Sequence, residues 1–167
     1  MQKTGDPIIV EETYATTPSV VWNAITEIDQ MRKWYFQNIP EFKAEVGFRA
    51  QFLIESGERE FLHLWKVTEV TPKESLVHNW RYEGYPGDSF VTFEIIEEEG
   101  ATRLRLTHQV RESFPKDIAE FSRESCSGGW AYFIKMSLKA YLEEKYASGS
   151  VAQRLSESSR ALKERKE

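Results

Sequence analysis

The stretch SGGWAYFIKMSLKAYLEE at residues 127–144 decides the fold that the sequence predicts. Its apolar side chains recur three or four positions apart, which is the spacing of one face of an α-helix. The members of this stripe are Trp130, Phe133, Ile134, Leu138, Tyr141 and Leu142. Because nearly all of the preceding chain alternates like β-strand, we expect the helix to lie across the concave face of a curved antiparallel sheet, where it can enclose a cavity.

Length and composition are those of one globular domain. The chain has 167 residues, of which 40% are hydrophobic and 13% aromatic, so it carries enough apolar surface for a core. A net charge of −5 and the lack of a basic run argue against a nucleic-acid partner. No apolar run approaches the roughly 20 residues needed to cross a bilayer, and no signal peptide is visible, so we expect no membrane insertion. A lone cysteine, Cys126, fits a reducing cytoplasm.

The sequence divides into a domain over residues 1–147 and a polar extension over residues 148–167. The extension is rich in Ser, Glu, Arg and Lys, and Val151, Leu155 and Leu162 give it only a thin apolar stripe. This composition is typical of a frayed helix or a disordered tail. The alternative is a helix that docks on a partner subunit, and so a homodimer.

Cap and turn signals predict two short helices after a first strand, and then further strands. Residues 8–15 alternate as the first strand, and Thr17-Pro18 is typical of a helix start, because threonine caps a helix and proline fits its first turn. A second helical turn is expected at residues 29–34. The later expected strands cover residues 48–54, 60–70, 76–83, 91–95 and 103–110.

Hairpin centres at Pro72-Lys73, Tyr85-Pro86 and Glu99-Gly100 predict which residues stand side by side. The three predicted rows are Trp65, Trp80, Val91 and His108; Val67, His78, Phe93 and Leu106; and His63, Tyr82, Ser89 and Val110. All of them should face the helix, so the interior would carry aromatic rings with polar tips that need partners when buried. A ligand pocket would use such groups to orient its ligand, whereas in a solid core they would satisfy one another.

The pocket interpretation predicts a ligand-binding cavity between the sheet and the C-terminal helix. Aromatic rings would supply burial and stacking, and the histidines and one tyrosine would orient polar groups. The predicted lining residues are Trp34, Phe36, Phe52, His63, Trp65, His78, Trp80, Tyr82, Phe93, His108, Trp130 and Phe133.

The sequence offers no motif for a metal, a cofactor or a nucleotide. In the predicted register the three histidines are separated by two rows or two strands, which is too far for one zinc ion. No His-Glu-x-x-His, Cys-x-x-Cys or glycine-rich phosphate loop occurs. We therefore expect no metal and no cofactor, and we assign no catalytic residue.

Several short motifs, taken in order, resemble the START-like or SRPBCC superfamily, and in particular the branch named for activators of the heat-shock-protein-90 ATPase. The matching segments are TTPSVVWNAI at 16–25, RKWY at 32–35, VTEVTP at 67–72, LVHNW at 76–80, ATRLRLTH at 101–108, and GGW to KAYLE at 128–143. The resemblance implies an α+β helix-grip fold, also called Bet v 1-like. In this fold a curved seven-stranded antiparallel sheet wraps around a long C-terminal helix, with two short helices after the first strand. The seventh strand would lie near residues 41–44.

Three functions remain open. The first is binding of a small hydrophobic or aromatic molecule in the cavity, where members of the superfamily often hold such ligands. The second is an enzyme of the polyketide cyclase, aromatase or hydratase type that uses a cavity histidine such as His78 or His108. The third, implied by the family name alone, is a chaperone co-factor that activates a heat-shock-protein-90-type ATPase through its outer surface. The inward polar groups favour binding over catalysis.

Overall fold

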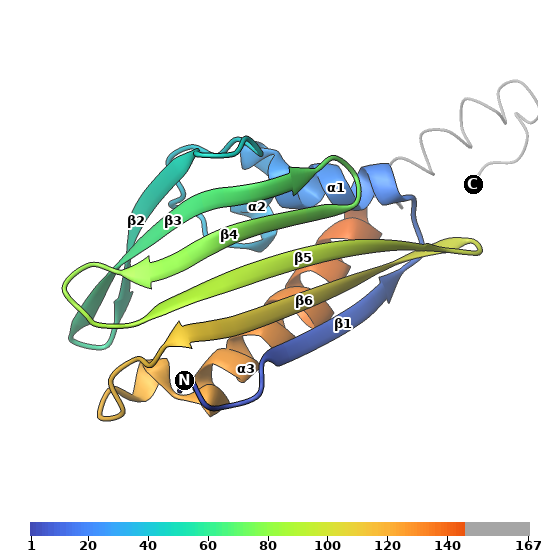
Figure 1. Cartoon of the computed structure of the whole chain (residues 1–167). Coiled ribbons are helices and arrows are strands. Elements are labelled where there is room, and N and C mark those ends of the chain that lie inside the picture. The colour runs from blue at the N-terminus through green and yellow to red at the C-terminus, as the bar shows by residue number, and fades with distance from the viewer. Residues whose placement is uncertain (146–167) are drawn as a thin grey trace, which may run out of the picture.

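A six-stranded antiparallel sheet, in the order β1-β6-β5-β4-β3-β2, is crossed on one face by the C-terminal helix (Figure 1). The computed structural model describes residues 1–145, so the expectations for residues 146–147 and for the extension at 148–167 lie outside the described residues. The strands are β1 (Ile8–Tyr14), β2 (Arg49–Ser56), β3 (Arg59–Thr71), β4 (Ser75–Tyr82), β5 (Asp88–Glu98) and β6 (Ala101–Glu112). The helical elements are α1 (Pro18–Thr26), α2 (Ile28–Trp34), η1 (Ala119–Phe121), α3 (Arg123–Ala131) and the π-helical η2 (Tyr132–Ser137), after which residues 138–145 continue the helix. This is the α+β helix-grip arrangement that the resemblance implies.

The seventh strand expected near residues 41–44 is not present. These residues have no strand pairing, and regular pairing on this side of the sheet begins with β2. Phe42 is nevertheless buried, and its ring packs edge-on against Phe48 and Trp65 at centroid distances of 5.9 and 6.3 Å. One buried aromatic side chain in an irregular segment therefore accounts for the apolar signal without a strand.

The two short helices form where the sequence predicts them. Thr17 caps α1, because its hydroxyl oxygen accepts a hydrogen bond from the Val20 amide at 3.3 Å, and Pro18 occupies the first turn. The Trp34 indole in α2 donates to the Ala24 carbonyl in α1 at 2.8 Å. This bond holds the two helices together at the end of the cavity region.

The predicted register is correct for two hairpins and wrong for the third. The pairs Trp65–Trp80 and Val91–His108 form as expected across β3–β4 and β5–β6. Across β4–β5, however, Trp80 pairs with Ser89 rather than with Val91, which is a slip of two residues. An even slip keeps every side chain on its predicted face.

Glycine conformation explains this slip. Gly84 and Gly87 both have positive φ, 82° and 126°, and the β5–β6 ladder is irregular between Asp88 and Ser89. The turn therefore centres nearer to Gly84 than the Tyr85-Pro86 signal indicates. As a result His78 and His108 share one row, with Val91 between them.

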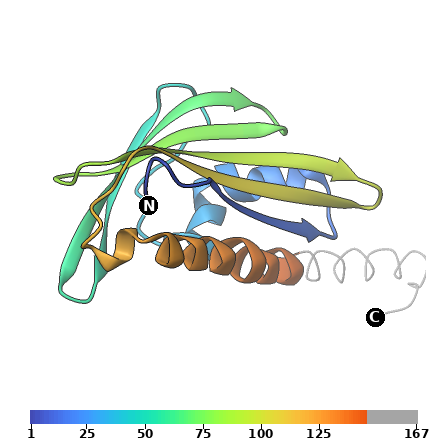
Figure 2. The same cartoon turned by 60° about the horizontal axis from the view of Figure 1, so that its bottom comes forward.

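The C-terminal helix runs beneath the concave side of the sheet (Figure 2). Trp130, Ile134, Leu138 and Leu142 are buried at intervals of four residues, and in a regular α-helix such a series drifts by about 40° per step. The wider turn of η2, in which the Leu138 amide donates to the Phe133 carbonyl five positions back, reduces that drift. The series therefore stays directed at the sheet.

Polar contacts fix this helix to both neighbouring layers. The Tyr14 hydroxyl of β1 donates to the Ile134 carbonyl at 2.6 Å, and the Ser137 hydroxyl donates to the Trp34 carbonyl of α2 at 2.6 Å. Glu12 forms ion pairs with Lys135 and Lys139 at 3.2 and 2.8 Å. These contacts attach the helix on the β1 side of the sheet.

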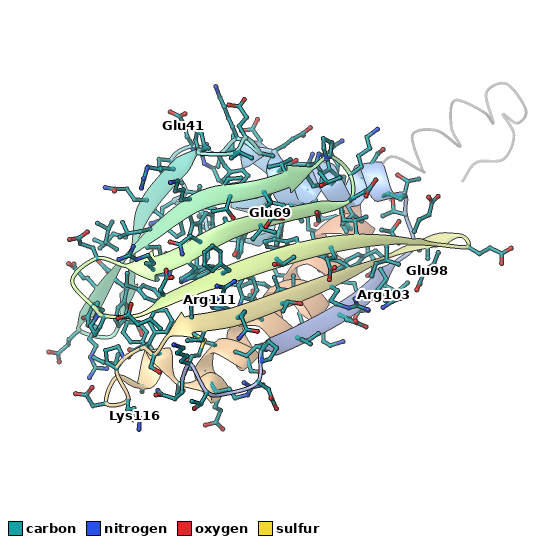
Figure 3. All side chains as sticks on the ribbon, viewed as in Figure 1. Glu41, Glu69, Glu98, Arg103, Arg111 and Lys116 are labelled. Atoms are coloured by element: carbon teal, nitrogen blue, oxygen red, sulfur yellow. The ribbon has the colours of Figure 1, made fainter. Side chains whose placement is uncertain are left out.

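The outer face of the sheet is charged, in contrast to the face beneath the helix. Figure 3 shows Glu69, Glu98, Arg103 and Arg111 along the strands on this face. Arg103 pairs with Glu98 at 2.8 Å, and the Arg111 guanidinium lies over the Phe90 ring at 5.1 Å. Within residues 1–145, no helix is long and apolar enough to cross a membrane.

The packing of Gly87 yields a stability prediction. A Cβ at this position would run into the Phe114 ring, whereas a Cβ at Gly84 would meet nothing within 4 Å. We expect Gly84→Ala to lower the free energy of unfolding by about 1 kcal/mol through backbone strain, and Gly87→Ala to lower it by about 3 kcal/mol, because strain and overpacking add. Urea denaturation of both variants measures the difference, and equal losses would contradict the assigned role of Phe114.

Candidate functional site

A cavity of about 130 Å³ lies between the sheet and the start of the C-terminal helix. Strand β4 contributes Trp80 and Tyr82, and β6 contributes His108, because alternate residues of a strand face the same side. The complete lining is Phe36, Trp80, Tyr82, His108, Cys126, Gly129, Trp130 and Phe133. The floor residues from the sheet are buried, whereas Gly129 is exposed and Phe36 is half-buried, so the cavity opens between the helix and the loop after α2.

Six of the twelve residues predicted to line a cavity do so: Phe36, Trp80, Tyr82, His108, Trp130 and Phe133. The other six, Trp34, Phe52, His63, Trp65, His78 and Phe93, are buried in the aromatic core beside it and are not part of its lining. The role of all twelve in ligand binding stays a prediction. Helical spacing from Trp130 could have added Cys126, four residues earlier, because it lies on the same face.

His108 is held in a buried chain of hydrogen bonds. The Trp130 indole N–H donates to His108 Nδ1 at 3.0 Å, and an indole nitrogen can only donate, so Nδ1 carries no proton. His108 Nε2–H therefore donates to the Ser89 hydroxyl at 2.8 Å, and Ser89 donates to the Trp80 carbonyl at 2.8 Å. Burial, followed by the neighbouring His78, lowers the pKa of His108 to about 3. This histidine is neutral near pH 7, and both of its ring nitrogens are occupied.

His63 and His78 have local backbone partners. His63 Nδ1 lies 3.1 Å from the Phe61 carbonyl, and His78 Nδ1 lies 3.1 Å from the Asn79 carbonyl. Burial lowers the pKa of each histidine to about 4. Among residues 1–145, no three His, Cys, Asp or Glu side chains are grouped so that they could hold a metal ion.

Three buried polar groups near these rings have no hydrogen-bond partner: the indole N–H groups of Trp65 and Trp80 and the hydroxyl of Tyr35. An unsatisfied buried donor costs about 1–3 kcal/mol, so each such group requires an explanation. Of the three residues, Trp80 lines the cavity. A molecule in the cavity with an acceptor atom could satisfy its N–H.

The ionisable groups of the lining are uncharged near pH 7. Burial raises the pKa of the Cys126 thiol to about 11, and it raises the pKa of Tyr82 further above its usual value of 10. Neither a thiolate nor a phenolate is therefore available in the cavity at neutral pH. The interior is an aromatic, neutral environment with one unpaired donor from the sheet.

A second, larger hollow of about 310 Å³ lies between the first residues of the chain and the start of α3. It includes Lys116 and Arg123, but the Arg123 guanidinium already donates to the backbone carbonyls of Asp6 and Pro7. Its principal cation is thus engaged within the protein. The smaller cavity has the unpaired group and is the better candidate site.

Comparison with known proteins supports the fold. Residues 15–143 match the family model described as Activator of Hsp90 ATPase homolog 1-like protein. The Mll3558 protein from Rhizobium loti has a similar structure, with a TM-score of 0.71 and 20% identity over 81% of this chain and 96% of that one. A search of curated protein sequences finds no match.

Two further solved structures have names that refer to chaperone biology. PFC0360w, an HSP90 activator from Plasmodium falciparum, has a TM-score of 0.65 and 26% identity over 83% of this chain and 97% of that one. The Aha1 dimer from Colwellia psychrerythraea has a TM-score of 0.59 and 22% identity over 81% of this chain and 94% of that one.

The buried histidines make stability depend on pH. His108 has a pKa of about 3 in the folded state and an ordinary value of 6.5, so below pH 6.5 the unfolded chain binds the proton and the folded chain does not. The stabilisation is complete above pH 6.5 and is lost as the pH falls towards 3. Between pH 7 and pH 5 we expect His108 to account for a loss of about 2 kcal/mol of unfolding free energy.

His108→Gln provides the measurement, because glutamine can still accept from Trp130 and donate to Ser89 but does not titrate. Urea unfolding at pH 7, 6 and 5 should give a shallower decline for the variant than for the wild type. Parallel declines would show that His108 is not the titrating group.

Proposed function

We propose a function for a chain that belongs to the Activator of Hsp90 ATPase homolog 1-like protein family: it binds a small hydrophobic or aromatic ligand in the cavity between the sheet and the C-terminal helix. The observation that carries this proposal is a cavity lined by aromatic rings that contains a buried, unpaired indole N–H. Binding pockets combine such apolar surface with a few placed polar groups. A packed core would instead fill the space and pair the donor.

Binding without turnover is favoured by the state of the lining groups. A general base needs a free nitrogen or carboxylate within reach of its substrate, and His108 uses both nitrogens inside the protein. The other two histidines are not part of the lining. A cyclase or hydratase at this site would have to break the bond between Trp130 and His108 before its histidine could accept a proton.

Two adjacent glycines of α3 provide a matched test of binding. A Cβ at Gly128 or at Gly129 meets nothing within 4 Å, so either position accepts a larger side chain, and leucine gains about 1 kcal/mol of helix propensity at both. Gly129 lines the cavity and Gly128 does not. We expect Gly129→Leu to weaken ligand binding by at least about tenfold, because the side chain obstructs the mouth, and Gly128→Leu to bind like the wild type.

The measurement is a thermal-shift screen against aromatic acids, phenols, flavonoids, fatty acids and sterols, confirmed by tryptophan fluorescence. A ligand that binds the native state raises its stability according to its concentration relative to Kd. Equal binding by the two leucine variants would place the ligand elsewhere. If no compound binds, the proposal fails.

A second function, contact with an Hsp90-type chaperone, is favoured by a specific surface feature. Family membership and the 26% identity to the Plasmodium falciparum activator suggest such a partner. On the outer side of the C-terminal helix, Tyr132 and Met136 are 54% and 63% exposed beside a groove of about 460 Å³. Large exposed apolar side chains of this kind are typical of protein–protein contacts.

The chaperone proposal is tested with a purified Hsp90-type ATPase. We expect the wild-type protein to increase its ATPase rate, and Tyr132→Ala or Met136→Ala to reduce the effect about fivefold at a fixed concentration, because each removes an apolar contact. Gly129→Leu is the control, since it blocks the cavity and leaves this groove intact. An unaltered ATPase rate at saturating protein would overturn the proposal.

A further inference from the structure

The cavity is sized for one aromatic ring. Its volume is about 130 Å³, and an apolar cavity of about 150 Å³ in another protein is known to hold benzene. The walls suit a ring, because Trp80 and Trp130 meet edge to face with centroids 5.5 Å apart and Phe133 lies 6.3 Å from Trp130 in the same manner. Two fused rings, a sterol or a fatty acid would have to displace part of this lining.

The unpaired donor specifies a polar atom on that ring. Trp80 is 5% exposed, so water reaches its indole poorly, and its N–H has no partner within the protein. The other cavity indole, that of Trp130, already donates to His108. A ligand oxygen that accepts from Trp80 would remove the cost of a buried unsatisfied donor.

The charge state of the lining excludes ions. The eight lining residues include no Lys, Arg, Asp or Glu, and the His108 imidazole, the Cys126 thiol and the Tyr82 hydroxyl are all neutral near pH 7. A carboxylate transferred into such a site loses its hydration without gaining a counter-charge. A neutral ligand avoids this penalty.

We propose that the cavity selects a neutral, single-ring aromatic compound with one acceptor oxygen, of the phenol or aryl ketone class, which accepts a hydrogen bond from the Trp80 indole. This inference rests on the proposed binding function and narrows it by size, charge and hydrogen bonding.

Four probes test the proposal by calorimetric titration at pH 7: phenol, toluene, benzoate and 2-naphthol. Phenol should bind saturably, benzoate should bind more than about tenfold more weakly because its charge is unpaired, and 2-naphthol should bind more weakly than phenol because its second ring does not fit. Trp80→Phe should lower the ratio of phenol affinity to toluene affinity about fivefold, as expected for the loss of one hydrogen bond.

Trp65→Phe is the matched control for this ratio. Trp65 pairs with Trp80 across the β3–β4 ladder, is equally buried and also has an unpaired N–H, but it does not line the cavity. We expect the control to leave the affinity ratio unchanged. An equal fall in both variants would assign the effect to general loosening of the aromatic core and overturn the role of Trp80.

A measurement on the unaltered protein keeps the test decisive even where a tryptophan variant fails to fold. The indole N–H resonances of the five tryptophans can be followed by NMR. Phenol, but not toluene, should shift the Trp80 indole proton as a hydrogen bond forms, and the Trp65 proton should not move in this way. An identical response to both compounds overturns the hydrogen bond.

The outcomes separate this inference from the function on which it rests. Tighter binding of 2-naphthol, a fatty acid or a sterol than of phenol, with loss of that binding in Gly129→Leu, overturns the size limit and leaves the cavity as a binding site. Tighter binding of benzoate than of phenol overturns the charge argument alone. No binding of any probe or of any compound in the wider screen overturns both proposals.

Discussion

The hydrogen bond from the Trp130 indole to His108 is the contact on which the interior depends. It joins the C-terminal helix to β6, and the bonds that continue through Ser89 to the Trp80 carbonyl extend the connection across β5 to β4. Each group in this chain is buried and each has a partner, so the network favours one arrangement of helix and sheet over others. The cavity is the space that remains on the β4 side of this connection, and its shape follows from it.

The same network changes the meaning of the interior histidines. Three histidines facing inward in a predicted β-sheet suggest a reactive or metal-binding centre. In the structure each has a hydrogen-bond partner within the protein, and burial keeps each pKa well below 6.5. Their polar atoms act as fixed donors and acceptors of the core, which leaves the polar role in the cavity to an indole. This division is consistent with a protein that binds a molecule without transforming it.

Sequence periodicity was sufficient to predict most of the fold. The Thr17 cap, the alternation of the strands and the helical stripe that includes Trp130 depend on local chemistry, and each forms where it was expected. The β4–β5 register depends on the left-handed conformation of Gly84 and Gly87, which a turn signal at Tyr85-Pro86 does not reveal. The irregular segment around Phe42 shows the related problem, because burial of one side chain resembles a strand in a pattern of hydrophobicity.

The candidate site was only half predictable for a physical reason. Alternation shows which side chains face inward, and it placed Trp80, Tyr82 and His108 correctly towards the helix. It cannot distinguish a residue beside a cavity from one packed within the core, because that depends on how rings from distant elements meet. Phe52, for example, lies 5.0 Å from the His63 ring and 4.8 Å from the Trp65 ring, and these contacts fill the space it faces.

The π-helical segment of the C-terminal helix has a consequence for how this helix tolerates changes in length. A wide turn of this kind corresponds to one residue more than a regular helix would need, and each residue of an α-helix advances the phase by about 100°. Deleting one residue from Tyr132–Ser137 would restore a regular spiral and rotate everything after it by that angle. Leu138 and Leu142 would then turn away from the sheet, while Trp130 and its bond to His108 would stay in place. The segment thus acts as a phase adjustment that separates the part of the helix that bounds the cavity from the part that secures it to the sheet, so the two halves can diverge independently in sequence.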